Sequence, residues 1–465
     1  MEADLLIAEI GSTTTLVTAF AGLAEGRPMR IGQGQSETTI LQDDVTIGLE
    51  KAIADMRRTA GGEITWKDMV ASSSAAGGLR MTVHGLAYDM TVRAAKEAAL
   101  GAGANIKMIT AGELTGYDIE EIKAIAPNII LLAGGVDYGE RKTVIANARL
   151  VAASGLKIPV IFAGNLTAKP EVKRILEEVG ITVFAVENVY PKIDNLNVEP
   201  TRAVIQDVFE KHITEAPGMR KIRDMVTGRI IPTPGAVMLG AKLLQSAIGD
   251  LVAIDVGGAT TDVHSVTEGS SEYTSKAMEP EPFAKRTVEG DLGVFVSAPQ
   301  VLALCDEGKL AARMGCDPDR LLEHSRPIPT NDMEIMLSEE LTTVAATVAM
   351  NRHAGRLDYM YGPSGRMSIV KGKDLTAVKW IIGTGGALTK LPAGRRILEA
   401  LNHREDSPQL FPRNGEVVLD SNYIMAAAGL MGGSYPEAAL ALMRESMGIP
   451  DSVGREEPGT SGESA

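Results

Sequence analysis

The amino-acid sequence predicts an α/β protein made of two related lobes, with a separate α/β domain inserted into the first. Two stretches share one pattern, an apolar strand, an acid, glycine with hydroxyl residues and a second strand: DLLIAEIGSTTTLVTAF at 4–20 and AIDVGGATTDVHS at 253–265. Such a repeat indicates two lobes that face each other. From about residue 66 to residue 195, short apolar runs alternate with helical stretches, which indicates βα units and a mainly parallel sheet.

Length and charge limit the possible functions. A chain of 465 residues exceeds what one hydrophobic core usually supports, so we expect two or more domains. The formal net charge of −14 argues against a general nucleic-acid binder, because phosphates would be repelled. Two cysteines, Cys305 and Cys316, are typical of a reducing compartment. With neither a basic secretory start nor an uncharged apolar run of membrane-spanning length, we expect a cytoplasmic protein without membrane partners.

Local patterns give an expected domain division. Helical spacing and end signals predict helices at 41–60, 232–249 and 338–355. We expect a first lobe at 1–65, an inserted α/β domain at 66–195 that is a candidate for partner binding, and a return to the first lobe with a connecting helix at 196–245. A second lobe at 246–421, a second connecting helix that completes the first lobe at 422–450 and a disordered tail at 451–465 then follow.

The two glycine turns have the composition of a phosphate-binding site. Main-chain N–H groups at a glycine turn, with Ser and Thr hydroxyls beside them, form a donor surface that suits phosphate oxygens. If the turns face each other, the candidate ligands are Gly11, Ser12, Thr13 and Thr14 on one side and Gly257, Gly258, Thr260 and Thr261 on the other. Taken alone, either stretch can equally be a β-hairpin with a structural glycine turn.

Three carboxylates accompany these turns: Glu9, Asp255 and Asp262. Carboxylates beside phosphates repel them unless a hard cation intervenes, and Mg²⁺ prefers carboxylate, water and phosphate oxygens. We therefore predict Mg²⁺ at Glu9 and Asp255. All three acids are catalytic candidates, because a carboxylate can orient the water that attacks a phosphoryl group. The six histidines lack the spacing that places two metal ligands on one helical face.

A third glycine-rich element follows at 378–392, VKWIIGTGGALTKLP, which reads as a strand and then a helix start. Gly383, Gly385 and Gly386 at this turn would let a flat base and ribose lie against the backbone, although a structural βα turn is an alternative. The sequence has no GxxxxGK[ST] motif, which disfavours a Walker-type ATPase.

Two further segments leave alternatives open. ASSSAAGGLRM, which includes Arg80, can be another phosphate loop or an ordinary loop. RTVEGDLG contains Arg286, Glu289 and Asp291, which can contact a nucleotide, link the lobes or form a solvated charged loop.

Five motifs in this order resemble the superfamily of actin, the 70-kDa heat-shock chaperones and sugar kinases. They are LLIAEIGSTTT, LVAIDVGGATTDV, TPGAVMLGAKLL, IIGTGGAL and NYIMAAAGLMGG. The resemblance implies two actin-like, ribonuclease H-like lobes that bind ATP and Mg²⁺. One departure is Glu9, where the superfamily usually has Asp; the longer side chain moves the carboxylate outward, and slow hydrolysis is expected.

Over nearly its full length the chain resembles the MutL family of glutamate mutase accessory proteins. The motifs are AEIGSTTT, SSSAAGGLRMTVHGL, NIILLAGGVDYGER, PVIFAGN, RTVEGDLG and KGKDLT. The resemblance implies an ATP-driven reactivating chaperone that releases damaged cobalamin from an adenosylcobalamin-dependent mutase, with the insert touching the mutase. A small-molecule kinase of the same fold and a filament-forming, actin-like structural ATPase are the alternatives.

Overall fold

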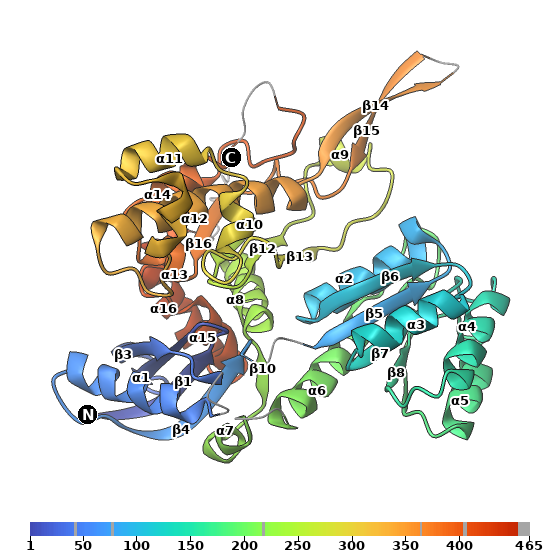
Figure 1. Cartoon of the computed structure of the whole chain (residues 1–465), viewed down its shortest axis with the longest axis horizontal. Coiled ribbons are helices and arrows are strands. Elements are labelled where there is room, and N and C mark those ends of the chain that lie inside the picture. Colours follow the sequence, from blue (N-terminus) through green and yellow to red (C-terminus); the bar gives the residue numbers. More distant parts are fainter. Residues whose placement is uncertain (41–43, 76–78, 216–218, 363–364, 403–406, 454–465) are drawn as a thin grey trace, which may run out of the picture.

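The computed structural model describes residues 1–40, 44–75, 79–215, 219–362, 365–402 and 407–453. Within these ranges the chain forms three five-stranded sheets and one two-stranded hairpin (Figure 1). The predicted disordered tail lies outside the described residues from residue 454 onward. No helix in these ranges is long and apolar enough to cross a membrane.

The first sheet has the strand order β10-β4-β1-β2-β3. Its strands are β1 (Glu2–Ile10), β2 (Thr14–Ala21), β3 (Met29–Glu37), β4 (Thr65–Ser73) and β10 (Ile230–Pro232). Strands β1, β2 and β3 pair antiparallel, while β4 and β10 extend the sheet in parallel. Helix α1 (Thr46–Thr59), which confirms the helix predicted at 41–60, packs on β2 and β3.

The second sheet repeats this topology in the order β13-β12-β11-β16-β17. Its strands are β11 (Leu251–Val256), β12 (Thr261–Val266), β13 (Ala284–Glu289), β16 (Trp380–Thr384) and β17 (Glu416–Leu419). Again three antiparallel strands come first and two parallel strands follow. Two sheets with this ribonuclease H-like order make the two actin-like lobes that the repeated motif predicts.

Helices and a hairpin complete the second lobe. The long helix α12 (Asp332–His353) packs across β11, β12 and β13. Shorter helices are α9 (Ser271–Thr274), α10 (Ala298–Leu302), α11 (Glu307–Met314), η3 (Pro318–His324), α13 (Gly386–Thr389) and α14 (Gly394–Glu399). The hairpin of β14 (Arg356–Gly362) and β15 (Gly365–Lys371) projects away from the body of this lobe (Figure 1).

The insert holds an entirely parallel sheet in the order β6-β5-β7-β8-β9. Its strands are β5 (Arg80–Gly85), β6 (Asn105–Ala111), β7 (Ile129–Leu132), β8 (Val160–Phe162) and β9 (Val183–Ala185). Its helices are η2 (Tyr88–Val92), α2 (Arg93–Gly101), α3 (Gly116–Ile125), α4 (Lys142–Ala153) and α5 (Lys169–Glu178). The predicted βα units are therefore confirmed.

The expected start of the insert at residue 66 needs a correction. Strand β4 pairs with β1 over its whole length, because its buried face continues the core of the first sheet. The parallel sheet of the insert therefore begins only at Arg80, after β4 has ended. The other expected domain boundaries stay predictions.

Two helices join the lobes at their base. Helix α8 (Thr233–Ile248) and helix α15 (Met425–Met431) touch through their backbones, since a Cβ on Gly429 would lie 1.9 Å from the Ala236 carbonyl oxygen. A continuous apolar core includes Ile7 of β1, Leu244 of α8 and Ala253 of β11. Helix α16 (Pro436–Met447) packs on α8 and α15, whereas α6 (Glu199–Glu215) packs on α2 and β10, and α7 (Arg220–Met225) packs against α6.

Candidate functional site

The two glycine turns have the same hydrogen bond. In the turn between β1 and β2, the Gly11 N–H donates to the Thr14 carbonyl at 2.9 Å. In the turn between β11 and β12, the Gly257 N–H donates to the Thr260 carbonyl at 2.9 Å. The predicted strand–turn–strand device is thus confirmed twice, once in each lobe.

The two turns also touch each other. A Cβ atom on Gly258 would lie only 2.6 Å from the Thr13 hydroxyl oxygen, so glycine is required for this close approach. Beside the contact lies a cavity of about 1080 Å³. Its walls include ten of the predicted site residues: Glu9, Gly11, Ser12, Thr13, Thr14, Asp255, Gly257, Gly258, Thr260 and Asp262.

Glu9 and Asp255 stand at the ends of equivalent strands, β1 and β11. Burial, together with repulsion from Asp420 and Asp255, raises the pKa of Glu9 to about 8. Burial and the neighbouring Asp262 raise the pKa of Asp255 to about 7, although the Arg286 guanidinium opposes the shift. Both carboxyl groups therefore favour a proton until a cation approaches.

Asp262, the third predicted acid, has a cationic partner. Its Oδ1 accepts hydrogen bonds from Arg286 Nη2 at 2.7 Å and from Arg286 Nε at 3.1 Å, and both side chains are buried. Its Oδ2 accepts a hydrogen bond from the Thr260 hydroxyl at 3.0 Å. Asp262 and Arg286 thus fix the second glycine turn to β12 and β13.

The sequence analysis missed Asp420, which follows β17 and is fully buried. Burial raises its pKa, and it accepts hydrogen bonds from the Ser446 hydroxyl, the Thr384 hydroxyl and the N–H groups of Ile424 and Met425. It therefore anchors the start of α15 behind Glu9. The single acid of LDSNYIMAAAG could have drawn attention to this position.

Four predicted contacts lie outside the cavity walls: Thr261, Gly383, Gly385 and Gly386. The buried Thr261 hydroxyl donates to the Leu292 carbonyl at 2.7 Å, so it faces the core. Gly383 is covered by Leu398 and Leu419. Gly385 has φ +82°, and a Cβ there would lie 2.4 Å from Asp255 Oδ1; this glycine makes room for the carboxylate. Their contact with a nucleotide stays a prediction.

The RTVEGDLG segment supports the second turn from behind. After it, the N–H groups of Phe295 and Val296 donate to the Gly258 carbonyl at 2.9 Å and 2.7 Å. Arg352 of α12 binds Glu289 and Asp291 and fixes the loop. Glu289 and Asp291 therefore bind within the second lobe, and Arg286 binds the Leu100 carbonyl of α2, so none of these contacts links the two lobes. Contact of the segment with a nucleotide stays a prediction.

The ASSSAAGGLRM segment lies partly outside the described residues, at 76–78. Ser73 and Ser74 line the cavity, and the Ser12 hydroxyl donates to the Ser74 carbonyl at 3.0 Å. The segment therefore supports the first glycine turn, while Arg80 is absent from the cavity walls.

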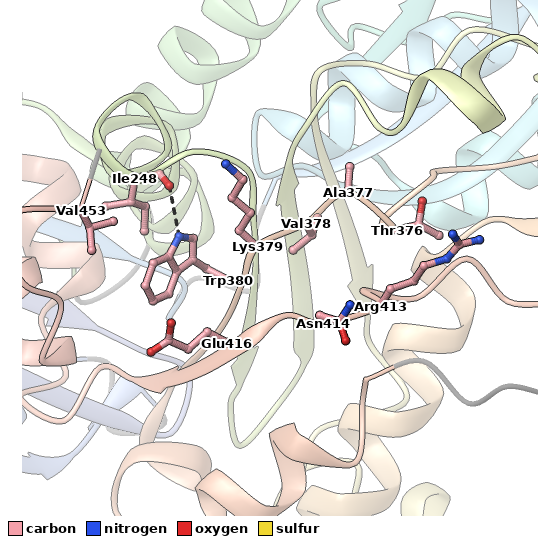
Figure 2. Close-up of a pocket in the computed structure, with 10 residues that line it drawn as sticks. All are labelled: Ile248, Thr376, Ala377, Val378, Lys379, Trp380, Arg413, Asn414, Glu416 and Val453. Atoms are coloured by element: carbon pink, nitrogen blue, oxygen red, sulfur yellow. Dashed lines mark hydrogen bonds between the residues drawn. The ribbon is translucent and has the colours of Figure 1, made fainter. Parts of the chain in front are cut away.

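A second pocket, of about 500 Å³, lies at the other end of the second sheet (Figure 2). Trp380 lies within it and donates its indole N–H to the Ile248 carbonyl at 3.1 Å. It contains none of the predicted site residues.

The cavity residues fit Mg²⁺ together with phosphates. Glu9 Oε1 is buried and has no hydrogen-bond partner in the described part of the chain, so it is available to a cation or its water. No group of three or more His, Cys, Asp or Glu side chains there can hold a metal by itself. Mg²⁺ commonly takes only one or two carboxylates and completes its shell with water and phosphate oxygens.

Two solved structures align over most of this chain at low sequence identity. Among solved structures, acetone carboxylase in its nucleotide-free form aligns over 92% of this chain and 69% of its own at 12% identity, with a TM-score of 0.38. Nucleotide-free diol dehydratase-reactivating factor aligns over 94% of this chain and 98% of its own at 12% identity, with a TM-score of 0.33. Both TM-scores are low, and we infer nothing about function from them.

The sequence comparisons are decisive. Protein MutL of Clostridium tetanomorphum is 39% identical over 464 residues, which cover 96% of this chain and 99% of that protein. The profile of the family described as MutL protein matches residues 5–447. The chain therefore belongs to the MutL protein family.

Proposed function

We propose that this chain is a Mg²⁺-dependent ATPase that reactivates an adenosylcobalamin-dependent mutase, with glutamate mutase as the expected partner. The observation that carries the proposal is the contact between Gly258 and Thr13, which brings two phosphate-type turns together beside the buried Glu9 and the half-buried Asp255. Membership of the MutL family supports the mutase as partner.

Each part of the cavity has a role in this proposal. The main-chain N–H groups and hydroxyls of the two turns hold phosphate oxygens. Asp255 orients the attacking water, and Arg286 keeps Asp262 and the second turn in place. Bound at Glu9 and Asp255, Mg²⁺ would neutralise charge on the phosphates.

Reactivation requires that nucleotide changes the shape of the protein. A closed state with ATP between the turns and a relaxed state after hydrolysis would bind the mutase differently, and only such differential binding can shift the conformation of a partner. The close backbone contact of α8 and α15 joins the lobes where this motion would pivot. The mutase, shifted to another conformation, would then release its damaged corrinoid.

The test is rescue of a mutase inactivated by loss of its adenosyl group. We expect activity to return on addition of this protein, ATP, Mg²⁺ and fresh adenosylcobalamin, with release of the damaged cobalamin followed by its absorption spectrum. Asp255→Ala should abolish rescue, whereas Asp68→Ala, which changes an exposed acid on β4, should preserve it. Rescue that proceeds without nucleotide would contradict the proposal, and phosphate transfer to an added sugar would favour a kinase.

A further inference from the structure

The insert forms one wall of the cavity between the lobes. The lining residues from the insert lie on α2 and at the start of β6: Lys96, Leu100, Gly103, Ala104, Asn105, Ile106, Lys107, Met108 and Ile109. A Cβ on Gly103 would lie 2.7 Å from the Pro232 side chain and 3.6 Å from Arg286 Nη1. The insert is thus in contact with the site.

Two lysines on this wall are free of ion pairs with the described residues. Of the other charged groups that line the cavity, Arg286 pairs with Asp262, while Glu289 and Asp291 pair with Arg352. Within the described chain, Lys96 and Lys107 have neither a salt bridge nor a side-chain hydrogen bond, and both line the cavity. A bound polyphosphate would supply the negative charge that these two lysines lack. The lysines would in turn offset the repulsion between the polyphosphate and the acids of the cavity.

Lys96 is held close to the second glycine turn. It lies one helical turn before Leu100 on the same face of α2. The Leu100 carbonyl accepts a hydrogen bond from Arg286 Nη1 at 2.8 Å, and the same guanidinium binds Asp262. This guanidinium therefore joins α2 directly to the strand that follows the turn.

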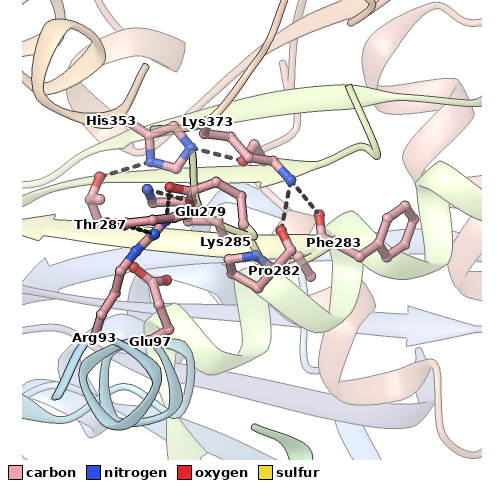
Figure 3. Close-up of polar contacts among 12 residues, drawn as sticks. Arg93, Glu97, Glu279, Pro282, Phe283, Lys285, Thr287, His353 and Lys373 are labelled. Atoms are coloured by element: carbon pink, nitrogen blue, oxygen red, sulfur yellow. Dashed lines mark hydrogen bonds and ion pairs between the residues drawn. The ribbon is translucent and has the colours of Figure 1, made fainter. Parts of the chain in front are cut away.

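The same helix face is attached to the second lobe by charged side chains. Figure 3 shows Arg93 and Glu97 of α2 facing the strand that carries Lys285. Arg93 forms ion pairs with Glu279 and Glu281, and Glu281 pairs with Lys285 at 2.8 Å. These contacts fix the rotation of α2, so Lys96 is held on the side of the cavity.

Lys107 reaches the cavity through an irregularity in the sheet. Strand β6 is an edge strand, and its pairing with β5 passes from Ile106–Met81 directly to Met108–Thr82. Lys107 is thus the extra residue of a β-bulge. Bulges at sheet edges redirect a side chain and are common beside functional sites, and Lys107 is a lining residue of the cavity.

We propose that Lys96 and Lys107 bind the outer phosphates of the nucleotide, so that the insert closes on the triphosphate and senses its hydrolysis. This inference rests on the proposed ATP site and extends it, because the phosphate ligands then come from three parts of the chain. Loss of the terminal phosphate would weaken the attachment of the insert, the part expected to touch the mutase.

The experiment measures ATP and AMP binding by calorimetry in the presence of Mg²⁺. The variants of the full-length chain are Lys96→Gln, Lys107→Gln and the double substitution. Since a hydrogen bond to a charged group contributes about 1.5–3 kcal/mol, affinity for ATP should fall about 10- to 100-fold in each single variant. Affinity for AMP, which lacks the outer phosphates, should stay unchanged. Lys142→Gln is the matched control, because Lys142 is exposed on α4 of the insert, away from the cavity.

A second readout separates phosphate binding from damage to the fold. ATP should slow hydrogen exchange in α2 and β6 of the unmodified protein but not of the double variant, and Lys96→Arg should retain most of the ATP affinity. If the unmodified protein binds ATP and both glutamine variants bind it equally well, this inference is wrong, while the proposed function still stands. Unmodified protein that does not bind ATP would overturn the proposed function as well.

Discussion

The two glycine turns have equal backbones but unequal surroundings. Each is closed by one hydrogen bond of 2.9 Å, from Gly11 to Thr14 and from Gly257 to Thr260. The first turn is held by one hydroxyl, Ser12 on Ser74, and by the Thr38 N–H, which donates to the Thr13 carbonyl at 2.9 Å. The second turn is held by the loop that follows RTVEGDLG, in which the N–H groups of Phe295 and Val296 share one carbonyl.

The acids differ in the same way. Asp255 has Arg286 near enough to oppose its pKa shift, whereas among the causes of the Glu9 shift only a main-chain hydrogen bond from Ala427 opposes it. The acid of the second turn therefore has a cationic neighbour that partly offsets its pKa shift, whereas no cationic side chain is among the causes of the Glu9 shift. We infer that Asp255 serves the chemical step while Glu9 serves cation binding.

The largest expected effect compares the two acids in ATP turnover. Asp255→Asn should lower kcat about 100- to 1000-fold, because a group that orients water in the transition state is lost. Glu9→Gln should lower kcat much less and raise the Mg²⁺ concentration needed for half-maximal rate. Phosphate release measured across a Mg²⁺ titration checks both.

Two results would contradict the assignment of the chemical step to Asp255 and of cation binding to Glu9. Equal kcat losses for the two variants would show that both acids act in one step. An unchanged Mg²⁺ requirement in Glu9→Gln would remove the cation role. Glu50→Gln, on the exposed face of α1, provides the control and should behave like the unmodified protein.

The next effect concerns the contact between the turns. Gly258→Ala places a Cβ 2.6 Å from Thr13 Oγ1, so the lobes must separate slightly and ATP affinity should fall about tenfold. In the double variant with Thr13→Ala the contacts with Thr13 Oγ1 and Cγ2 are absent, and only the Cβ atom of residue 13 remains near, at 3.3 Å. We expect its loss in ATP affinity, measured by calorimetry, to be smaller than the sum of the two single losses. Strict additivity would show that the turns do not meet in solution.

Much of this contrast could be predicted from the sequence. The motifs around Gly11 and Gly257 predicted the hairpins, since glycine between two apolar runs permits a tight turn. The alternating runs of the insert predicted its parallel sheet. These are local signals, and the structure confirms them. The contact of Gly258 with Thr13 depends on packing between the lobes, and the repeated motif indicated only that the lobes face each other.

Contacts between segments that lie far apart in the sequence could not be predicted from it. Asp420 supports the start of α15 from a position with no motif of its own, and its role follows from burial beside Glu9. Thr261 matched its hydroxyl neighbours in type, yet strand alternation turns it toward Leu292, away from the cavity. Lys107 faces the cavity through a bulge, and no single-sequence pattern marks one extra residue in an edge strand.

A further expected effect is on stability and tests the protonation of the first acid, Glu9. The pKa of Glu9 is about 8 in the folded chain against an ordinary value of 4.5, so the folded state keeps a proton that the unfolded chain releases between these pH values. Stability of the nucleotide-free protein should therefore fall as pH rises from about 4.5 to about 8.

Glu9→Gln removes this titration, because the amide stays neutral at every pH in this window. Urea unfolding should give nearly equal free energies for the variant and the unmodified protein at pH 5, and a variant more stable by about 1–3 kcal/mol at pH 8. Glu50→Gln should show no such crossover, because Glu50 is exposed. A variant that is less stable than the unmodified protein at pH 8 would mean that the carboxylate already has a donor or cation in the free protein. The proposed difference between the two turns would then disappear, since each acid would have a partner that favours its ionised form before the nucleotide binds.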